Sequence, residues 1–110
     1  MQPNLFDNNA KSVEAERILL YALGEFQSRG KILAARELAL DRLRGAFRRA
    51  TEKFDAAELS DETIADALSK MGAKIVRVPV FVAKHPFRVT VQTELAEKAK
   101  EFYKNTLEND

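Results

Sequence analysis

The chain has 110 residues, with 18 Lys and Arg against 17 Asp and Glu, one His and no Cys. This length fits a single domain, and the lack of cysteine excludes disulfides, thiol catalysis and cysteine-held metals. A hydrophobic content of 45% with 32% charged residues is typical of a chain that folds. Because the apolar runs are short and the N-terminus lacks a signal-peptide pattern, we expect a cytoplasmic protein that does not enter a membrane.

Charge is distributed in blocks. Residues 29–53 hold eight bases and three acids, residues 54–69 hold five acids and no base, and residues 70–91 hold five bases and no acid. Two basic segments around an acidic one would polarise the molecule if they shared a side. Alternatively, the opposite charges pair across the fold.

The first predicted helix covers residues 12–28. Before it, residues 1–11 are expected to form a flexible tail, because proline and asparagine favour turns and the segment has no periodicity. From Ser12 onward the apolar residues recur at helical spacing, and Gly30 supplies a stop. Residues 12–110 are then expected to form one domain.

Two further helices are expected before Gly72. Apolar residues at helical spacing predict a helix over 31–53. Ser60, followed by acids, marks the N-cap of a shorter helix over 61–71. The buried face of this shorter helix would consist of Ile64, Ala65, Leu68 and Met71.

After Gly72 the period changes from helical to alternating, which predicts a β-hairpin connected by residues 83–86. Pro79 marks its first strand as an edge strand or a bulge, because proline cannot donate to the ladder. A last amphipathic helix starts at Thr93 and either covers the apolar face of the hairpin or pairs with a second copy in a homodimer. The predicted apolar face is Val76, Val78, Val80, Val82, Phe87, Val89 and Val91. The expected fold class is α+β, mostly helical: three helices, a β-hairpin and a C-terminal helix.

Three helices followed by a hairpin resemble the winged-helix variant of the helix-turn-helix, over residues 12–92. The resemblance implies that the helix over 61–71 enters the major groove and that the hairpin, as the wing, contacts phosphate or the minor groove. However, Asp61, Glu62 and Asp66 on this helix would be repelled by phosphate.

Basic side chains of the hairpin and of the helix over 31–53 are therefore better candidates for nucleic-acid contact. We expect Arg77 and Arg88 to share the polar face of the hairpin with Thr90. The alternative for the helix is that its bases are solvated or pair with Glu37, Asp41 and Glu52. The predicted nucleic-acid-binding residues are Arg44, Arg48, Arg77, Lys84, His85 and Arg88.

The N-terminal residues Gln2-Pro3-Asn4-Leu5-Phe6 resemble the short peptide with which bacterial replication and repair proteins bind the sliding clamp. The resemblance implies that Gln2 is the polar anchor and that Leu5 and Phe6 fill an apolar pocket of this partner. Alternatively, Leu5 and Phe6 fold back and pack against the start of the first helix.

Residues for catalysis are few. His85 has no sequence-evident nucleophile, orienting carboxylate or metal-binding partner, and no phosphate-binding glycine loop occurs. We therefore expect no enzyme, no cofactor and no metal. The leading hypothesis is a nucleic-acid-associated accessory or regulatory protein that contacts phosphate, and the alternative is a protein-interaction or dimerisation module.

Overall fold

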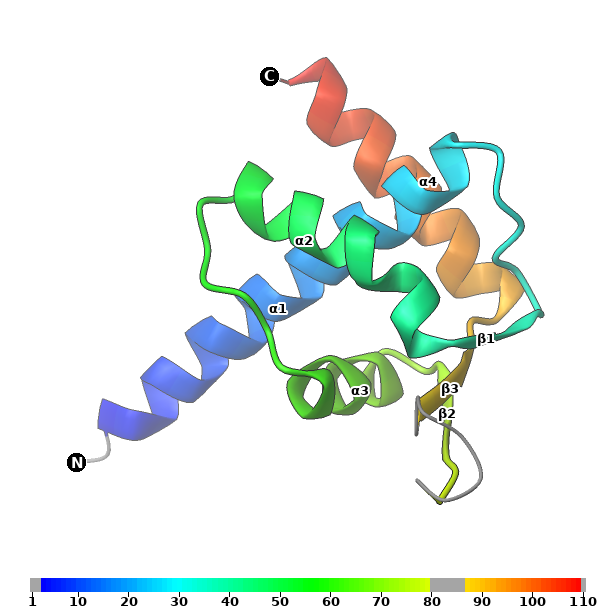
Figure 1. Cartoon of the computed structure of the whole chain (residues 1–110). Helices are drawn as coiled ribbons and strands as arrows, with labels where there is room; N and C mark the ends of the chain where they lie inside the picture. Colours follow the sequence, from blue (N-terminus) through cyan, green and yellow to red (C-terminus); the bar gives the residue numbers. More distant parts are fainter. Residues whose placement is uncertain (1–2, 80–86, 110) are drawn as a thin grey trace.

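The computed structural model describes the backbone of residues 3–79 and 87–109, and the side chains of these ranges from residue 14 onward. The fold is α+β, as predicted, with a small antiparallel sheet beside the helices (Figure 1). Its elements in chain order are α1 (Pro3–Ser28), β1 (Glu37–Ala39), the 3₁₀ turn η1 (Leu40–Leu43), α2 (Arg44–Lys53), α3 (Asp61–Lys70), β2 (Lys74–Arg77), β3 (Phe87–Thr90) and α4 (Thr93–Glu108).

Helix α1 is the central element, and α2, α3 and α4 all contact it (Figure 1). It begins at Pro3, so the prediction of a tail up to residue 11 and a helix start at Ser12 is wrong in its boundary. The helical spacing from Ser12 onward is confirmed, because Ile18, Leu19 and Leu23 are fully buried.

The contact between α1 and α4 depends on a glycine. A Cβ atom added to Gly24 would collide with the backbone oxygen of Ala99 and the Cβ of Tyr103, both on α4. The two helix backbones therefore approach more closely than any side chain at this position would allow. Leu95 and Ala96 are also buried on α4, as its amphipathic pattern predicts.

The predicted helix over 31–53 is wrong in its first half. Residues 37–39 form β1, residues 40–43 form η1, and only Arg44–Lys53 are α-helical. Leu38 and Leu40 are both buried, an alternation that fits a strand, and Ala35 has a positive φ of 58° that no helix contains. The apolar face of α2 itself is confirmed by the burial of Phe47 and Ala50.

The sheet has the order β1-β3-β2, so β3 is central and β2 is an edge strand. Strands β2 and β3 form the predicted antiparallel hairpin, and Pro79 follows the last paired residue of β2. Val89 lies opposite Ile75 on one side and Leu38 on the other, which places these three residues on the buried face. That face lies against η1 and α3.

This register corrects the first strand of the predicted apolar face of the hairpin, whereas Phe87, Val89 and Val91 are buried as predicted. Val76 lies opposite Arg88 and faces outward with 38% exposure, whereas Ile75 faces inward. A shift of one residue exchanges the two faces of a strand. Of the other predicted valines, Val80 and Val82 lie outside the described residues.

Helix α3 agrees with its prediction. The Ser60 side chain accepts a hydrogen bond from the Thr63 backbone amide at 3.2 Å, and the helix ends before Gly72, whose φ is +103°. Ile64, Ala65 and Leu68 are buried and Met71 packs partly against the core, so the opposite side of α3 faces solvent.

Candidate nucleic-acid interface

Arg44, the first residue of α2, lies beside the start of α3. Its Nε donates to Asp41 Oδ1 at 3.0 Å, and its Nη2 donates to Asp61 Oδ2 at 2.9 Å. The side chains of Arg44 and Asp61 are 47% and 40% exposed, so this ion pair is on the surface. The predicted alternative of pairing with Asp41 is confirmed for this arginine.

Arg77, the last residue of β2, reaches the same turn of α3. Its Nη2 donates to Glu62 Oε1 at 2.7 Å, and its guanidinium lies 5.0 Å from the centre of the Phe87 ring. Because Arg77 is directly opposite Phe87 in the ladder, it extends from the face of the sheet opposite Arg88 and Thr90. The prediction that these three residues share one polar face is therefore wrong.

The two arginines border one shallow groove of about 590 Å³. It joins the starts of α2 and α3 to the end of β2, which are far apart in sequence but neighbours in the fold. The groove combines two guanidiniums with three carboxylates, and its lining residues are Arg44, Glu58, Leu59, Ser60, Asp61, Glu62, Arg77 and Phe87. The ion pairs are exposed, so each is worth at most about 1 kcal/mol and can be exchanged for another anion.

Two further predicted site residues, Arg48 and Arg88, do not line this groove. Arg48 is exposed on α2, and Arg88 is half-buried on the outer face of the sheet. Neither makes an ion pair with another residue that the structure describes. Lys84 and His85 lie outside the described residues, so their predicted contact with nucleic acid stays a prediction.

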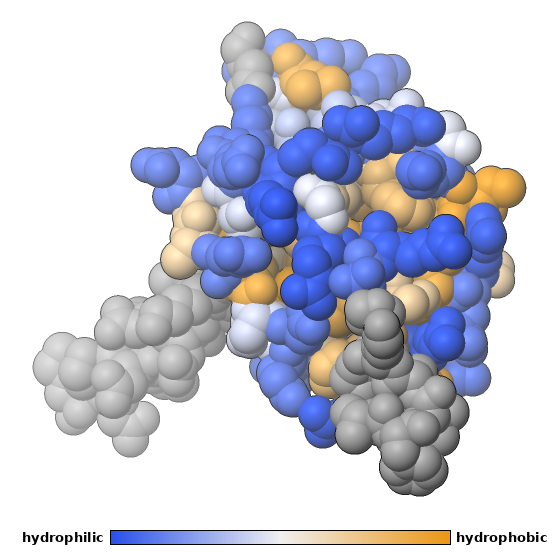
Figure 2. All heavy atoms as spheres, in the orientation of Figure 1, coloured by the Kyte–Doolittle hydropathy of each residue, from blue (hydrophilic) through white to orange (hydrophobic). Residues whose placement is uncertain are grey.

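A second basic hollow was not predicted. A cavity of about 280 Å³ between the end of α1 and η1 is lined by three cations, Lys31, Arg36 and Arg42, and by the exposed Ile32. All three cations belong to the basic segment 29–53, but the sequence did not place them together, because their grouping depends on the loop before β1 and on η1. The face of the molecule in Figure 2 is mainly hydrophilic, with hydrophobic residues in small patches.

One acid of the core has a structural role. Glu25 of α1 is only 7% exposed, and its carboxylate accepts hydrogen bonds from Nε and Nη2 of Arg49 and from Nε of Arg29. Burial by itself raises the pKa of Glu25, but the hydrogen bonds and charges of the two arginines outweigh it and hold the pKa below the ordinary value of 4.5. Arg49 thereby joins α2 to α1.

The N-terminal peptide predicted to bind a sliding clamp begins at Gln2, outside the described residues, while Leu5 and Phe6 belong to the first turns of α1.

Among the residues that the structure describes, no cluster of three acidic or histidine side chains could hold a metal ion. Nor does any helix in the described ranges combine the length and apolar character needed to cross a bilayer. Comparison with protein families, curated proteins and solved structures found no match for this chain.

Proposed function

We propose that this chain is a winged-helix-like domain that binds the phosphate backbone of duplex nucleic acid with the face around the start of α3. Three helices precede a β-hairpin. Strand β1, which lies between α1 and α2 in the chain, pairs with β3 of the hairpin, so the sheet connects the hairpin to the helical part of the fold. An attached hairpin can hold basic residues at a fixed place beside α3, which a free loop cannot do.

The observation that carries the proposal is that Arg44 and Arg77 both reach the first turn of α3, where they contact Asp61 and Glu62. They come from the two basic segments and border one groove, at the exposed end of the helix that the winged-helix resemblance would place in the major groove. Two guanidiniums that border one groove are suited to contact the phosphate backbone.

The carboxylates of Asp61 and Glu62 occupy these guanidiniums in the free protein. An exposed ion pair contributes at most about 1 kcal/mol, whereas each phosphate contact also releases condensed counterions. Phosphate oxygens can therefore replace the carboxylates at low salt. Phosphates would repel these acids if α3 entered the major groove, so we propose backbone contact by the two arginines, and not sequence reading by α3, as the main source of affinity.

The test is fluorescence anisotropy of a labelled random-sequence DNA duplex at about 20 mM and about 150 mM salt. We expect binding that weakens strongly with salt, and a loss of about tenfold or more at low salt for Arg44→Gln combined with Arg77→Gln. The matched control is Lys100→Gln combined with Lys104→Gln, two bases on exposed positions of α4. This control removes the same charge and should change affinity by less than about twofold.

Two outcomes would contradict the proposal. One is no binding even at low salt, which would favour the interaction module that the sequence left open. The other is an equal loss in both double variants, which would show that only the total charge matters. Far-UV circular dichroism of both variants keeps the comparison among folded proteins.

A further inference from the structure

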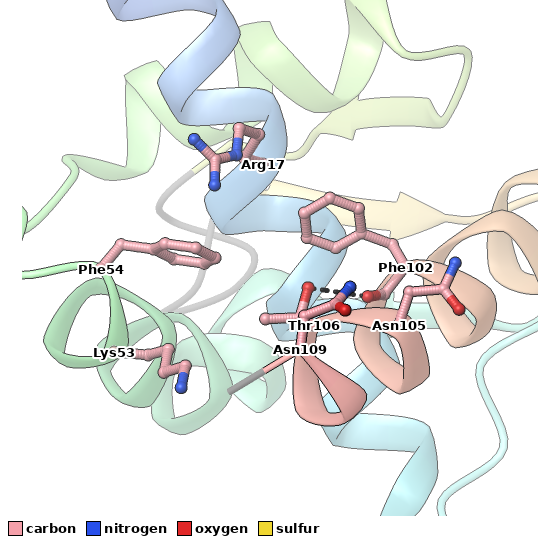
Figure 3. Close-up of a pocket in the computed structure, with 7 residues that line it drawn as sticks. All are labelled: Arg17, Lys53, Phe54, Phe102, Asn105, Thr106 and Asn109. Carbon is pink, nitrogen blue, oxygen red and sulfur yellow. Dashed lines mark hydrogen bonds between the residues drawn. The ribbon is translucent and has the colours of Figure 1, made fainter.

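A separate cavity of about 470 Å³ lies between α1, the end of α2 and the last turns of α4 (Figure 3). Its lining residues are Arg17, Lys53, Phe54, Phe102, Asn105, Thr106 and Asn109. None of them belongs to the groove at the start of α3. The volume is within the range of small-molecule sites in proteins.

The charged side chains that line this cavity are basic. Arg17 and Lys53 contribute two positive charges, and the lining contains no acidic side chain among the described residues. Arg17 makes no ion pair within the described part of the chain, and its guanidinium instead lies 5.2 Å from the centre of the Phe54 ring. The cavity therefore favours an anion near Arg17.

Two aromatic rings form its apolar part. In Figure 3, Phe54 and Phe102 lie on opposite sides of the cavity, with Arg17 beyond one end of the space between them and Thr106 and Asn109 near the other. Phe54 packs edge-to-face with Tyr21, with ring centres 5.5 Å apart and planes at 82°. Because both rings are half-buried, each keeps part of its surface open to a flat apolar partner.

Three of the remaining lining residues are polar and uncharged. The Thr106 hydroxyl already donates to the Phe102 backbone oxygen at 2.8 Å, which leaves its lone pairs to accept. The side-chain amides of Asn105 and Asn109 can donate or accept. The geometry points to an occupant that is flat and apolar at one end and anionic at the other.

We propose that this cavity binds a small aromatic carboxylate, with its ring between Phe54 and Phe102 and its carboxylate on the Arg17 guanidinium. The site is independent of the proposed nucleic-acid contact. Because its walls come from three helices, an occupant would also join the end of α2 to α1 and α4.

The probe is 2-naphthoate, titrated into the isotopically labelled full chain and followed by NMR chemical shifts. We expect saturable shifts centred on residues around Arg17, Phe54 and Phe102, with a Kd on the order of 1 mM for a ligand of this size. Two comparison compounds separate the contributions. 2-Naphthalenemethanol keeps the rings without the charge, acetate keeps the charge without the rings, and each should bind at least about tenfold more weakly.

Arg17→Gln should weaken 2-naphthoate binding by at least about fivefold, and Phe102→Leu should weaken it as well while keeping the site apolar. The matched control Arg36→Gln removes an exposed arginine that does not line this cavity and should leave binding unchanged. The proposal is overturned by the absence of shifts up to about 10 mM, by equal binding of the alcohol, or by equal effects of Arg17→Gln and Arg36→Gln.

Discussion

Replacing Arg49 by methionine should destabilise the protein more than replacing Glu25, although both variants break the same ion pair. The Glu25 side chain is only 9% exposed, whereas the Arg49 side chain is 41% exposed and can hydrate. Arg49→Met therefore leaves a buried carboxylate with Arg29 as its remaining hydrogen-bond donor, while Glu25→Met leaves an arginine that can hydrate.

The magnitude follows from what is lost and what remains. Removing one partner of a fully buried ion pair costs roughly 3–5 kcal/mol. Here Arg29 stays bonded to Glu25 at 3.2 Å, and the Arg49 side is partly screened by water, so we expect about 2 kcal/mol for Arg49→Met. For Glu25→Met we expect about 1 kcal/mol or less, because the methionine side chain also fills the buried space. The first loss corresponds to a decrease in Tm of roughly 8–12 °C for a domain of this size.

The assay is urea denaturation followed by circular dichroism, from about pH 3 to pH 7, on both variants and on the double variant. Because the pKa of Glu25 is lowered in the folded state, its contribution is fully present above the ordinary value of 4.5 and disappears as the pH falls through the lower folded-state pKa. The difference between the native protein and Arg49→Met should therefore shrink below about pH 4.5. The double variant should be at least as stable as Arg49→Met. A larger loss for Glu25→Met than for Arg49→Met at pH 7 would refute this reasoning.

Two further predictions concern the groove and the helix contact. Asp61→Asn and Glu62→Gln should each raise affinity for duplex DNA roughly two- to fivefold at low salt, because they release Arg44 or Arg77 from an exposed ion pair. The anisotropy assay described above measures this affinity, and unchanged or weaker binding would argue against phosphate contact by these arginines. Gly24→Ala should lower the free energy of unfolding by about 1–3 kcal/mol in urea denaturation, because a Cβ at this position collides with the α4 backbone; an unchanged midpoint would show that the two helices separate freely.

The elements predicted well from the sequence are those held by local signals. Helix α3 has a capping serine, a first turn of acids and a following glycine, all within the helix or within two residues of its ends. Strand β1 has none of these. It has only three residues and exists because β3 pairs with it, and the spacing of Leu40, Leu43 and Phe47 equally fits a helix that would pass through it. The chain also reverses direction at Ala35 through a positive φ, which the presence of an alanine does not predict.

The hairpin shows a different limit. Alternation predicted two strands and their pairing, but Ile75 and Val76 are both apolar, so the sequence fits either face. The choice is made by pairing with β3, whose Val89 also meets Leu38 of β1. The predicted face is therefore right for β3 and wrong for β2, and Arg77 lies toward α3 instead of beside Arg88.

Two arginines of α2 differ in a way that only the fold determines. Arg44 and Arg49 belong to the same basic segment and the same short helix, and the sequence makes them equivalent. One pairs with an exposed aspartate and the other with a buried glutamate. Replacing an exposed carboxylate by a phosphate costs little, whereas removing the partner of a buried carboxylate costs stability. Arg44 can therefore be replaced at little cost in stability and Arg49 cannot, so a test of nucleic-acid contact that neutralised the whole basic segment would lower stability together with any affinity.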